Sequence, residues 1–496
     1  VTLNHELWRD EVRSILLTTE VDSLSEFIRM AKYDGHPLLW RSILAGMYAI
    51  FKTPVVLQMS GLIIGFLSVW LFVKFSPFSL WIKTLFIFGI VPFGTNALMA
   101  RNYGITMLLF FLFALLLSRP VRRPILTGLV LMLAANTNSF GMYMSGLFLG
   151  YWIVDSGWYV LKDRRYIIAI VLTIVGVLFS YYITQAGVDA VFVTSDFMAQ
   201  IEYGKCFFDA VIHPGKYIWY LLNIDLVYRD IFMTVLVVAL AAVRPLLGLT
   251  VFVAVVFFNF VGGSVIYPQT RHQGVLLGFI MTAYWLALNI VKSKQQNDKF
   301  NYTKYIYYFS LIGFLVPFML HNISHSYHGA VEEVAREKSS AMALGKYIKA
   351  NRQLNDAIVI GSPDYAIQPI GYYTDNRIYV AREKHFKKFV TYSKQFKTDM
   401  KLSDLLDTAK ELYLTHNVPI LIALGYFGIS EQQPRTFNIM YRGTFEMGKE
   451  DIREFNQQTI KLAEFNSAMG DENYQLFLYA EREKLDAYQK NYMTLR

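Results

Sequence analysis

Long apolar runs separated by short polar loops dominate the chain between about residues 55 and 322. A helix needs about 20 mainly apolar residues to cross the hydrocarbon core of a bilayer. Runs that approach that length predict about ten spanning helices, at 55–73, 79–96, 99–118, 122–136, 139–154, 166–186, 231–243, 245–263, 274–291 and 305–322. The alternative for the pair 122–136 and 139–154 is a tight hairpin of shallow helices. The sequence therefore predicts a polytopic α-helical membrane bundle, because helices satisfy their own backbone hydrogen bonds in lipid.

The charged residues support this interpretation. They form only 17% of the 496 residues, whereas soluble domains average about 25%. The net charge of +9 is explained by Lys and Arg in cytoplasmic loops, so we expect no nucleic-acid partner. Five loops hold these basic residues: Lys74 and Lys83; Arg119, Arg122 and Arg123; Lys162, Arg164 and Arg165; Arg244; Lys292, Lys294 and Lys299.

Placing all five basic loops in the cytoplasm agrees with strict alternation of the spans. Residues 1–54 and 323–496 then lie on the outer side, as the first extracytoplasmic loop and a soluble domain. We expect a further spanning helix before Val1, because the chain starts outside. The expected location is a multi-pass cell-membrane protein of the bacterial cytoplasmic membrane, with the endoplasmic reticulum as the alternative.

The two outer regions have recognisable local patterns. Within 1–54, the apolar segment Leu38–Phe51 is too short to span and predicts a helix at the membrane surface. The tail alternates short apolar runs with helical periodicity, which predicts an α/β domain. The expected strands are Ala357–Ser362, Arg377–Ala381, Pro419–Leu424 and Gln475–Tyr479, and the expected helices are Leu402–Leu414 and Glu450–Met469.

An acidic pair, Asp10-Glu11, stands in the first outer loop. A carboxylate just outside the membrane is well placed to accept a proton from an acceptor hydroxyl, which makes both residues candidate catalytic groups. The alternative is that the two acids only begin a helix, where they suit the positive end of its dipole.

Arginine residues at the outer ends of spans are the second candidate feature. Arg101 stands at such an end, and Arg271-His272 occupy a short outer loop that enters the next span. Their N–H groups suit the phosphate oxygens of an anionic lipid. The alternatives are snorkelling of Arg101 and contact of Arg271 with ordinary lipid head groups.

We expect no metal or cofactor. The single cysteine, Cys206, excludes an intramolecular disulfide and a cysteine-based metal cluster. His321, His325 and His328 share helical spacing, but a polar helix leaving the membrane explains them without a metal.

Three features taken in order resemble the GT-C glycosyltransferases, in particular the protein O-mannosyltransferase and aminoarabinose-transferase branch. They are Asp10-Glu11, the turn Asp34-Gly35-His36-Pro37-Leu38, and the Arg271-His272 loop. Arg101-Asn102-Tyr103 is similar to an Arg-x-Tyr element of that branch, and Gly128–Asn138 is similar to a Gly-Leu-x-x-Leu-Thr-Lys tract. The chain departs from the branch at Asn138, where lysine is expected, and has one proline after His36 where the branch has two.

The resemblance implies inverting transfer of a hexose or pentose from a polyprenyl-phosphate donor to a hydroxyl of a glycan, lipid or protein. Asp10 would be the general base, with Glu11 beside it. Four residues would bind the lipid phosphate: Arg101, Tyr103, Arg271 and His272. Asp34 and His36 would shape the substrate site, and the soluble domain would cover it or select the acceptor.

Two other classes of function remain open from the residues alone. One is a transporter or flippase of lipids or lipid-linked sugars, although the sequence shows no internal repeat. The other is a non-catalytic membrane scaffold whose tail binds a partner, for which Asp10 would be dispensable.

Overall fold

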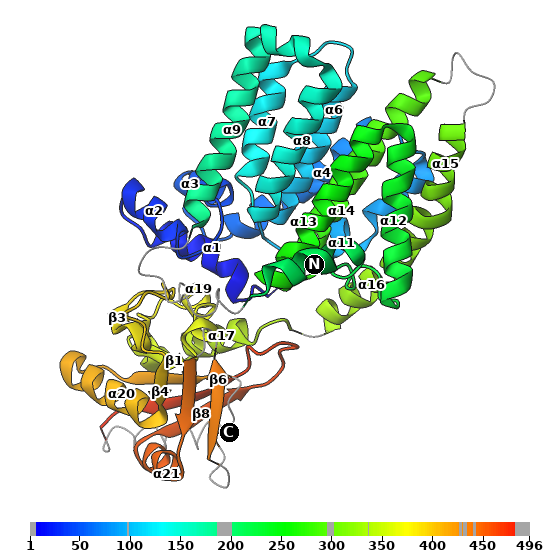
Figure 1. Cartoon of the computed structure of the whole chain (residues 1–496). Helices are drawn as coiled ribbons and strands as arrows, with labels where there is room; N and C mark the ends of the chain where they lie inside the picture. The colour runs from blue at the N-terminus through cyan, green and yellow to red at the C-terminus, as the bar shows by residue number, and fades with distance from the viewer. Residues whose placement is uncertain are drawn as a thin grey trace.

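In the computed structural model, a short N-terminal group of helices lies between a helical bundle and a smaller α/β domain (Figure 1). The structure describes residues 6–96, 99–185, 201–294, 302–335, 337–425, 429, 434–439 and 443–481. Two separate buried apolar clusters form the cores of the bundle and of the α/β domain.

Three helices precede the bundle: α1 (Arg9–Thr19), α2 (Leu24–Ala31) and α3 (Leu39–Phe51). α3 coincides with the helix expected at 38–51. Arg41, a charge within that apolar segment, is only 1% exposed. Its guanidinium donates to the Leu17 carbonyl at 2.8 Å and lies over the Phe27 ring at 4.4 Å. The charge of Arg41 is therefore directed towards α1 and α2.

Six helices among the described residues are long and apolar enough to cross a membrane. They are α4 (Val56–Phe75), α9 (Arg164–Thr184), α12 (Leu226–Val243), α13 (Pro245–Ser264), α14 (Thr270–Lys294) and the segment Lys304–Ser324, which runs through α15 (Tyr302–Ser310), η3 (Leu311–Leu315) and α16 (Val316–Ala335). The expected polytopic helical bundle is confirmed.

The remaining predicted spans correspond to helices outside these six candidates, most of them shorter than 18 residues. These are α5 (Leu80–Ile87) with the π-helical turn η1 (Ile90–Asn96), α6 (Tyr103–Ser118), α7 (Pro124–Ala135) and α8 (Ser139–Ser156); η2 (Trp158–Lys162) and α11 (Tyr203–Ile212) lie in connecting segments. The span expected at 79–96 is not one continuous α-helix. It is interrupted after Phe88, where Gly89 and Pro92 disfavour regular helical hydrogen bonding.

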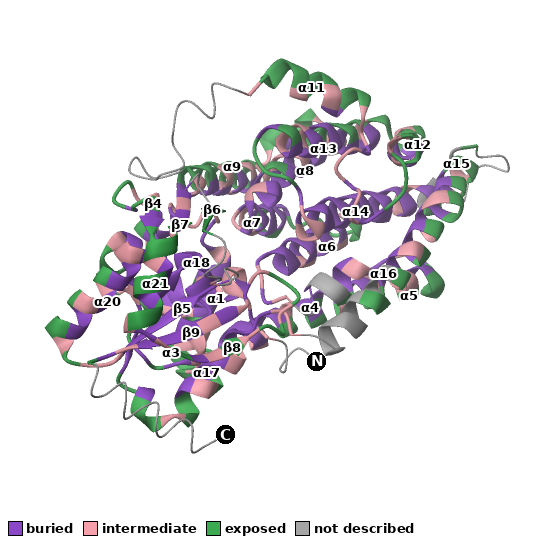
Figure 2. Ribbon diagram, turned by 90° about the horizontal axis from the view of Figure 1, so that it is seen from below, coloured by how far each residue is buried: buried purple, intermediate pink, exposed green. Residues whose placement is uncertain are grey.

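α14 lies at the centre of the bundle and α9 at its edge. In the most apolar stretch of α14, 89% of the residues are buried by the rest of the protein, compared with 28% in α9. Figure 2 shows the same contrast in the colouring of the two helices. α7 and α9 pack closely because Gly128 has no side chain: a Cβ atom there would lie 2.5 Å from the Ala169 Cα. Small residues allow such close approach of membrane helices.

Described basic residues of the predicted cytoplasmic loops lie at one end of the bundle. Lys292 Nζ donates to the Pro77 carbonyl at 2.9 Å, and Arg244 Nε lies 3.0 Å from Asp155 Oδ1. Arg119 lies over the ring of Phe75 at 5.9 Å. The α1–α3 group and the α/β domain lie at the opposite end (Figure 1).

The described part of the α/β domain contains three small sheets. The largest has the strand order β1-β5-β9-β8, in which β1 (Ile358–Ser362) runs parallel to β5 (Ile420–Leu424), while β9 (Tyr474–Tyr479) is antiparallel to both β5 and β8 (Ile460–Phe465). The second sheet contains β4 (Asp399–Lys401), β6 (Arg435–Ile439) and β7 (Gly443–Met447), in the order β4-β7-β6. In the third, β2 (Tyr379–Val380) pairs with β3 (His385–Phe386).

The helices of this domain are α17 (Ala341–Ala350), α18 (Asp364–Ile367), α19 (Ile370–Tyr373), α20 (Leu402–His416) and α21 (Lys449–Gln458), with the short turns η4 (Arg352–Leu354) and η5 (Ala381–Glu383). The expected helix at 402–414 is confirmed as α20. The expected helix at 450–469 was wrong beyond Gln458, because residues 460–465 form β8. This segment, in which only Leu462 is buried, pairs with β9, and this tertiary pairing outweighs the helical pattern.

Candidate active site

The Asp10 carboxylate lies between two guanidinium groups from distant parts of the chain. Asp10 stands in the first turn of α1, Arg101 two residues before the start of α6, and Arg271 in the first turn of α14. Asp10 Oδ2 is 3.5 Å from Arg101 Nη1 and 3.3 Å from Arg271 Nη2. The Asp10 side chain remains 30% exposed, so the carboxylate is partly accessible to solvent.

Arg101 also binds the backbone and a histidine of the first loop. Its Nη1 donates to the Asp10 carbonyl, and its Nη2 lies 3.3 Å from His36 Nε2. A guanidinium only donates hydrogen bonds, so His36 Nε2 must be the accepting nitrogen and the proton of the neutral ring is on Nδ1. Within the described part of the chain, His36 Nδ1 is buried without a hydrogen-bond partner.

The electrostatics of this centre keep Asp10 ionised and His36 neutral. Burial on its own would raise the pKa of Asp10, but Arg101, Arg271 and then Arg9 together hold it below its ordinary value. Burial lowers the pKa of His36 to about 4; Asp34 opposes this shift and Arg101 adds to it. Near neutral pH, Asp10 is thus a carboxylate and His36 an uncharged ring.

Tyr103 and His272 form a second pair beside the charged centre. The backbone N–H of Gln269 donates to His272 Nδ1 at 3.0 Å, which leaves the proton of a neutral ring on Nε2. His272 Nε2 lies 3.0 Å from the Tyr103 hydroxyl, so it donates to the phenolic oxygen. The Tyr103 hydroxyl hydrogen can then point towards another acceptor.

Glu11 is directed away from this centre. Its side chain is fully buried, and its carboxylate accepts hydrogen bonds from the backbone N–H groups of Ala100 at 2.8 Å and Trp8 at 3.3 Å. These bonds attach the start of α1 to the residue that precedes Arg101. The structure therefore gives Glu11 contacts that position Asp10 and Arg101.

Asp34 lies in the turn that carries His36. Its Oδ1 is 3.0 Å from Arg13 Nε, and its side chain is 5% exposed. Burial would raise the pKa of Asp34, but His36, Arg13 and Arg41 together lower it. Gly35 adopts a left-handed backbone with φ of 69°, which glycine tolerates at no steric cost and which helps the turn to present His36.

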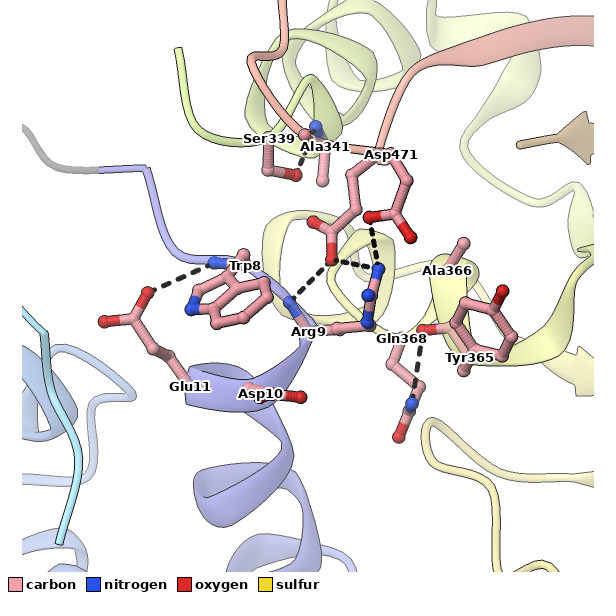
Figure 3. Close-up of polar contacts among 12 residues, drawn as sticks. Trp8, Arg9, Asp10, Glu11, Ser339, Ala341, Tyr365, Ala366, Gln368 and Asp471 are labelled. Atoms are coloured by element: carbon pink, nitrogen blue, oxygen red, sulfur yellow. Dashed lines mark hydrogen bonds and ion pairs between the residues drawn. The ribbon is translucent and has the colours of Figure 1, made fainter. Parts of the chain in front are cut away.

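The α/β domain holds the start of α1. Figure 3 shows Arg9 directed at Asp471, with Trp8 and Asp10 on either side of it in the chain. Arg9 Nη1 lies 2.6 Å from Asp471 Oδ1, and the Arg9 backbone N–H donates to Glu472 Oε1 at 2.9 Å. The sequence analysis did not identify Arg9, because its partners follow it by more than 460 positions.

The tract 128–138 has a structural role in the bundle. Thr137 and Asn138 are buried and share hydrogen bonds with Thr106 of α6, each at 2.7 Å. Asn102 Nδ2 donates to the Thr137 carbonyl at 2.7 Å. This network attaches the α7–α8 turn to the residue that follows Arg101.

No group of three or more His, Cys, Asp or Glu residues is arranged to hold a metal ion among the described residues. Of the three histidines with helical spacing, His328 contacts the Ser324 carbonyl at 2.7 Å. The side chain of His325 lies outside the described ones.

No family model and no curated protein matches the chain. Two solved structures of ArnT from Cupriavidus metallidurans are similar to it. The structure with bound undecaprenyl phosphate has a TM-score of 0.46 at 10% identity, covering 97% of this chain and 95% of the other. The apo structure has a TM-score of 0.48 at 11% identity, covering 96% and 94%. ArnT is an aminoarabinose transferase of the GT-C class, the class that the sequence resembles.

Proposed function

We propose that the chain is a membrane glycosyltransferase that moves a sugar from a polyprenyl-phosphate carrier to an acceptor hydroxyl, with inversion at the anomeric carbon. One observation carries the proposal: an ionised carboxylate, Asp10, stands between the guanidinium groups of Arg101 and Arg271 at one end of an apolar helical bundle. A base beside two anion-binding groups, at the end of membrane helices, suits a substrate that combines a hydroxyl, a phosphate and a lipid.

The reaction assigns a role to each charged group. The acceptor oxygen attacks the anomeric carbon, and the bond from that carbon to the carrier phosphate breaks. Asp10 takes the hydroxyl proton, while the electron pair of the broken bond stays on the phosphate. Arg101 and Arg271 stabilise the charge that develops on the leaving polyprenyl phosphate. Attack from the face opposite the phosphate inverts the sugar.

The two arginines also adjust the strength of the base. In the structure they lower the pKa of Asp10. A phosphate bound to the same guanidiniums would offset their positive charge, so the pKa of Asp10 would rise when the donor binds. Asp10 would then accept a proton more readily in the complex with the donor than in the free enzyme.

Uncharged neighbours complete the proposed site. The free Tyr103 hydroxyl hydrogen and the His36 Nδ1–H are donors for phosphate or sugar oxygens, and His272 fixes Tyr103 through its Nε2. Glu11 and Asp34 act through their partners: Glu11 positions the start of α1, and Asp34 positions the turn that carries His36.

The distribution of charge supports an outer location for this site. The described basic residues of these loops share one end of the bundle, and α1, which carries Asp10, lies at the other. If basic loops face the cytoplasm, residues 1–54 and the α/β domain at 323–496 are extracytoplasmic. The proposed location is a bacterial cytoplasmic membrane, with an acceptor hydroxyl on a glycan, lipid or protein.

A transfer assay in membranes tests the function. Wild type, Asp10→Asn and Asp155→Asn would each receive radiolabelled sugars on polyprenyl phosphates. Undecaprenyl phosphate, the ligand of one ArnT structure, is the first carrier to use. Asp155 pairs with Arg244 at the other end of the bundle, so Asp155→Asn is a matched control. We expect transfer by wild type and the control, and a loss of about 10²–10⁴-fold in Asp10→Asn.

The other outcomes separate the rival functions. Equal transfer by wild type and Asp10→Asn would keep the enzyme class and reject Asp10 as the base. Movement of labelled lipid between leaflets without a new product would support a flippase. Absence of both transfer and movement across a broad donor panel would support a scaffold.

A further inference from the structure

Arg13 joins three parts of the molecule that contribute to the proposed site. It lies one helical turn after Asp10 on α1, and residues three apart share a helix face. Its side chain is 13% exposed. Arg13 Nε contacts Asp34 Oδ1 at 3.0 Å and Nη2 donates to the Tyr33 carbonyl at 3.2 Å, whereas Nη1 donates to the α/β domain.

The contacts of Nη1 reach two groups that are themselves fixed. Nη1 donates to Gln368 Oε1 at 3.0 Å and to the Val390 carbonyl at 2.8 Å. Gln368 is 3% exposed, and its Nε2 donates to the Tyr365 carbonyl at 3.2 Å. The guanidinium also lies over the Tyr392 ring at 5.6 Å. The α/β domain therefore surrounds this side chain with two hydrogen-bond acceptors and an aromatic ring.

The other contacts of Arg13 lead back to the charged centre. Tyr33 and Asp34 begin the turn that ends at His36, and His36 contacts Arg101. Arg101 in turn contacts Asp10, which shares α1 with Arg13. The contacts form a closed ring, in which Arg13 sets the distance between the helix that carries Asp10 and the turn that carries His36.

We propose that Arg13 is a positioning residue through which the α/β domain, by way of Gln368, holds Asp10 and His36 in their reactive arrangement. The inference rests on the proposed glycosyl transfer for its catalytic consequence. Arg13 itself touches none of the reacting atoms. The α/β domain thereby becomes part of the catalytic machinery in addition to any role in selecting the acceptor.

The test removes the contact between Arg13 and Gln368 by changing the residue of the α/β domain, so that the groups proposed to react stay in place. Gln368→Met keeps the length and shape of the side chain but removes the oxygen that accepts from Arg13. Arg13→Lys keeps the charge, but an ammonium cannot reproduce the fork that serves both Asp34 and Gln368. Lys388→Met is the matched control, because Lys388 of the same domain makes a long, partly exposed contact of 3.8 Å with Glu20.

Two measurements are made on each full-length variant. Hydrogen exchange reports the order of α1 and of the turn at 33–36, independently of activity. We expect faster exchange in both segments of Gln368→Met and Arg13→Lys, and no change in Lys388→Met. For glycosyl transfer we expect kcat to fall about tenfold or more, since small misplacements of catalytic groups cost up to about 10² in rate, while KM for the donor stays within about twofold.

Unchanged hydrogen exchange in the turn at 33–36 of Gln368→Met would overturn the proposal that Gln368 acts through Arg13. A wild-type kcat in a Gln368→Met enzyme that shows faster exchange would overturn it as well. A rise in KM alone would also overturn it, because it would indicate lost substrate binding rather than lost positioning. If the wild type transfers no sugar, the proposed function fails, and the exchange data alone decide whether Arg13 connects the domain to α1 and the turn.

Discussion

Asp10 Oδ2 lies 3.3 Å from Arg271 Nη2, although 261 positions separate the two residues. One residue comes from the first turn of α1 and the other from the first turn of α14. Arg271 has a second neighbour in Trp8, whose ring lies 5.7 Å from the guanidinium. Arg271 Nε is buried without a hydrogen-bond partner in the described part of the chain. The described residues therefore leave one donor of Arg271 unsatisfied.

Arg271→Gln is expected to weaken binding of undecaprenyl phosphate by about tenfold or more, because a hydrogen bond to a charged group contributes about 1.5–3 kcal/mol. Binding can be measured by calorimetry on the detergent-solubilised protein. Arg244→Gln removes an arginine that also pairs with an aspartate, at the opposite end of the bundle, and should bind normally. Equal affinities of wild type and Arg271→Gln would exclude Arg271 from the phosphate site.

The acid limb of kcat/KM is expected to lie below about pH 5, with a flat profile from there to about pH 8. The pKa of Asp10 is below its ordinary value of 3.8, so the free enzyme keeps the base ionised as the pH falls through this range. His36 has a pKa of about 4 in place of 6.5, so it does not become charged there. A limb near pH 6.5 would contradict the neutral His36. In Arg271→Gln the limb should move to higher pH, because one of the charges that lowers the pKa of Asp10 is gone.

The helices of the bundle were predictable because apolar runs report burial in lipid directly. α4, α9 and α13 begin and end within two residues of the expected spans. The break in the span at 79–96 was not predicted, since its length and composition resemble those of a continuous helix. The local pattern at 460–465 was also ambiguous, and only the pairing with β9 decides it.

The candidate site was partly predictable from residue type. A charged residue at the end of an apolar run is costly unless it has a role, and this signal pointed to Arg101. Asp10 was a candidate as part of an acidic pair in an outer loop, and Arg271 as an N–H donor in a loop that enters a span. The opposite orientation of Glu11 could not be read from an adjacent pair of acids. Arg13 was also missed, because its partner Gln368 lies 355 positions away and nothing local distinguishes it from an exposed helix arginine.

The junction between α1 and the α/β domain should weaken as the pH rises. Burial raises the pKa of Glu472 from 4.5 to about 7, against the opposing effects of Ser339 and Arg9. A proton held more tightly in the folded state stabilises it fully below pH 4.5, and this contribution is lost as the pH rises through about 7. The shift corresponds to an upper bound of about 3 kcal/mol.

Glu472→Gln removes this titration. We therefore expect the Tm of the solubilised wild type to fall between about pH 5 and pH 8, and the Tm of Glu472→Gln to fall less over that range. Asp471→Asn is a suitable comparison, because Asp471 is 44% exposed and contacts the same Arg9. Parallel Tm curves for wild type and Glu472→Gln would show that Glu472 does not titrate with a raised pKa.

The close contact of α7 and α9 makes a last prediction about stability. A Cβ atom at Gly128 would meet the Cα and carbonyl oxygen of Ala169, each at 2.5 Å, and these are backbone atoms that cannot rotate away. Gly128→Ala should therefore push the helices apart and destabilise the protein by about 1–3 kcal/mol, the usual cost of overpacking.

Gly146→Ala is the matched control on the neighbouring helix α8, because a Cβ atom there has no heavy atom within 4 Å among the described residues. Both substitutions replace glycine within a helix and gain up to about 1 kcal/mol in helix propensity, so the difference between their Tm values isolates the clash with Ala169. We expect Gly146→Ala to match or exceed the wild-type Tm and Gly128→Ala to lie well below it. Equal Tm values for the two variants would mean that α7 and α9 can separate at little cost, and that Gly128 is not required for their packing.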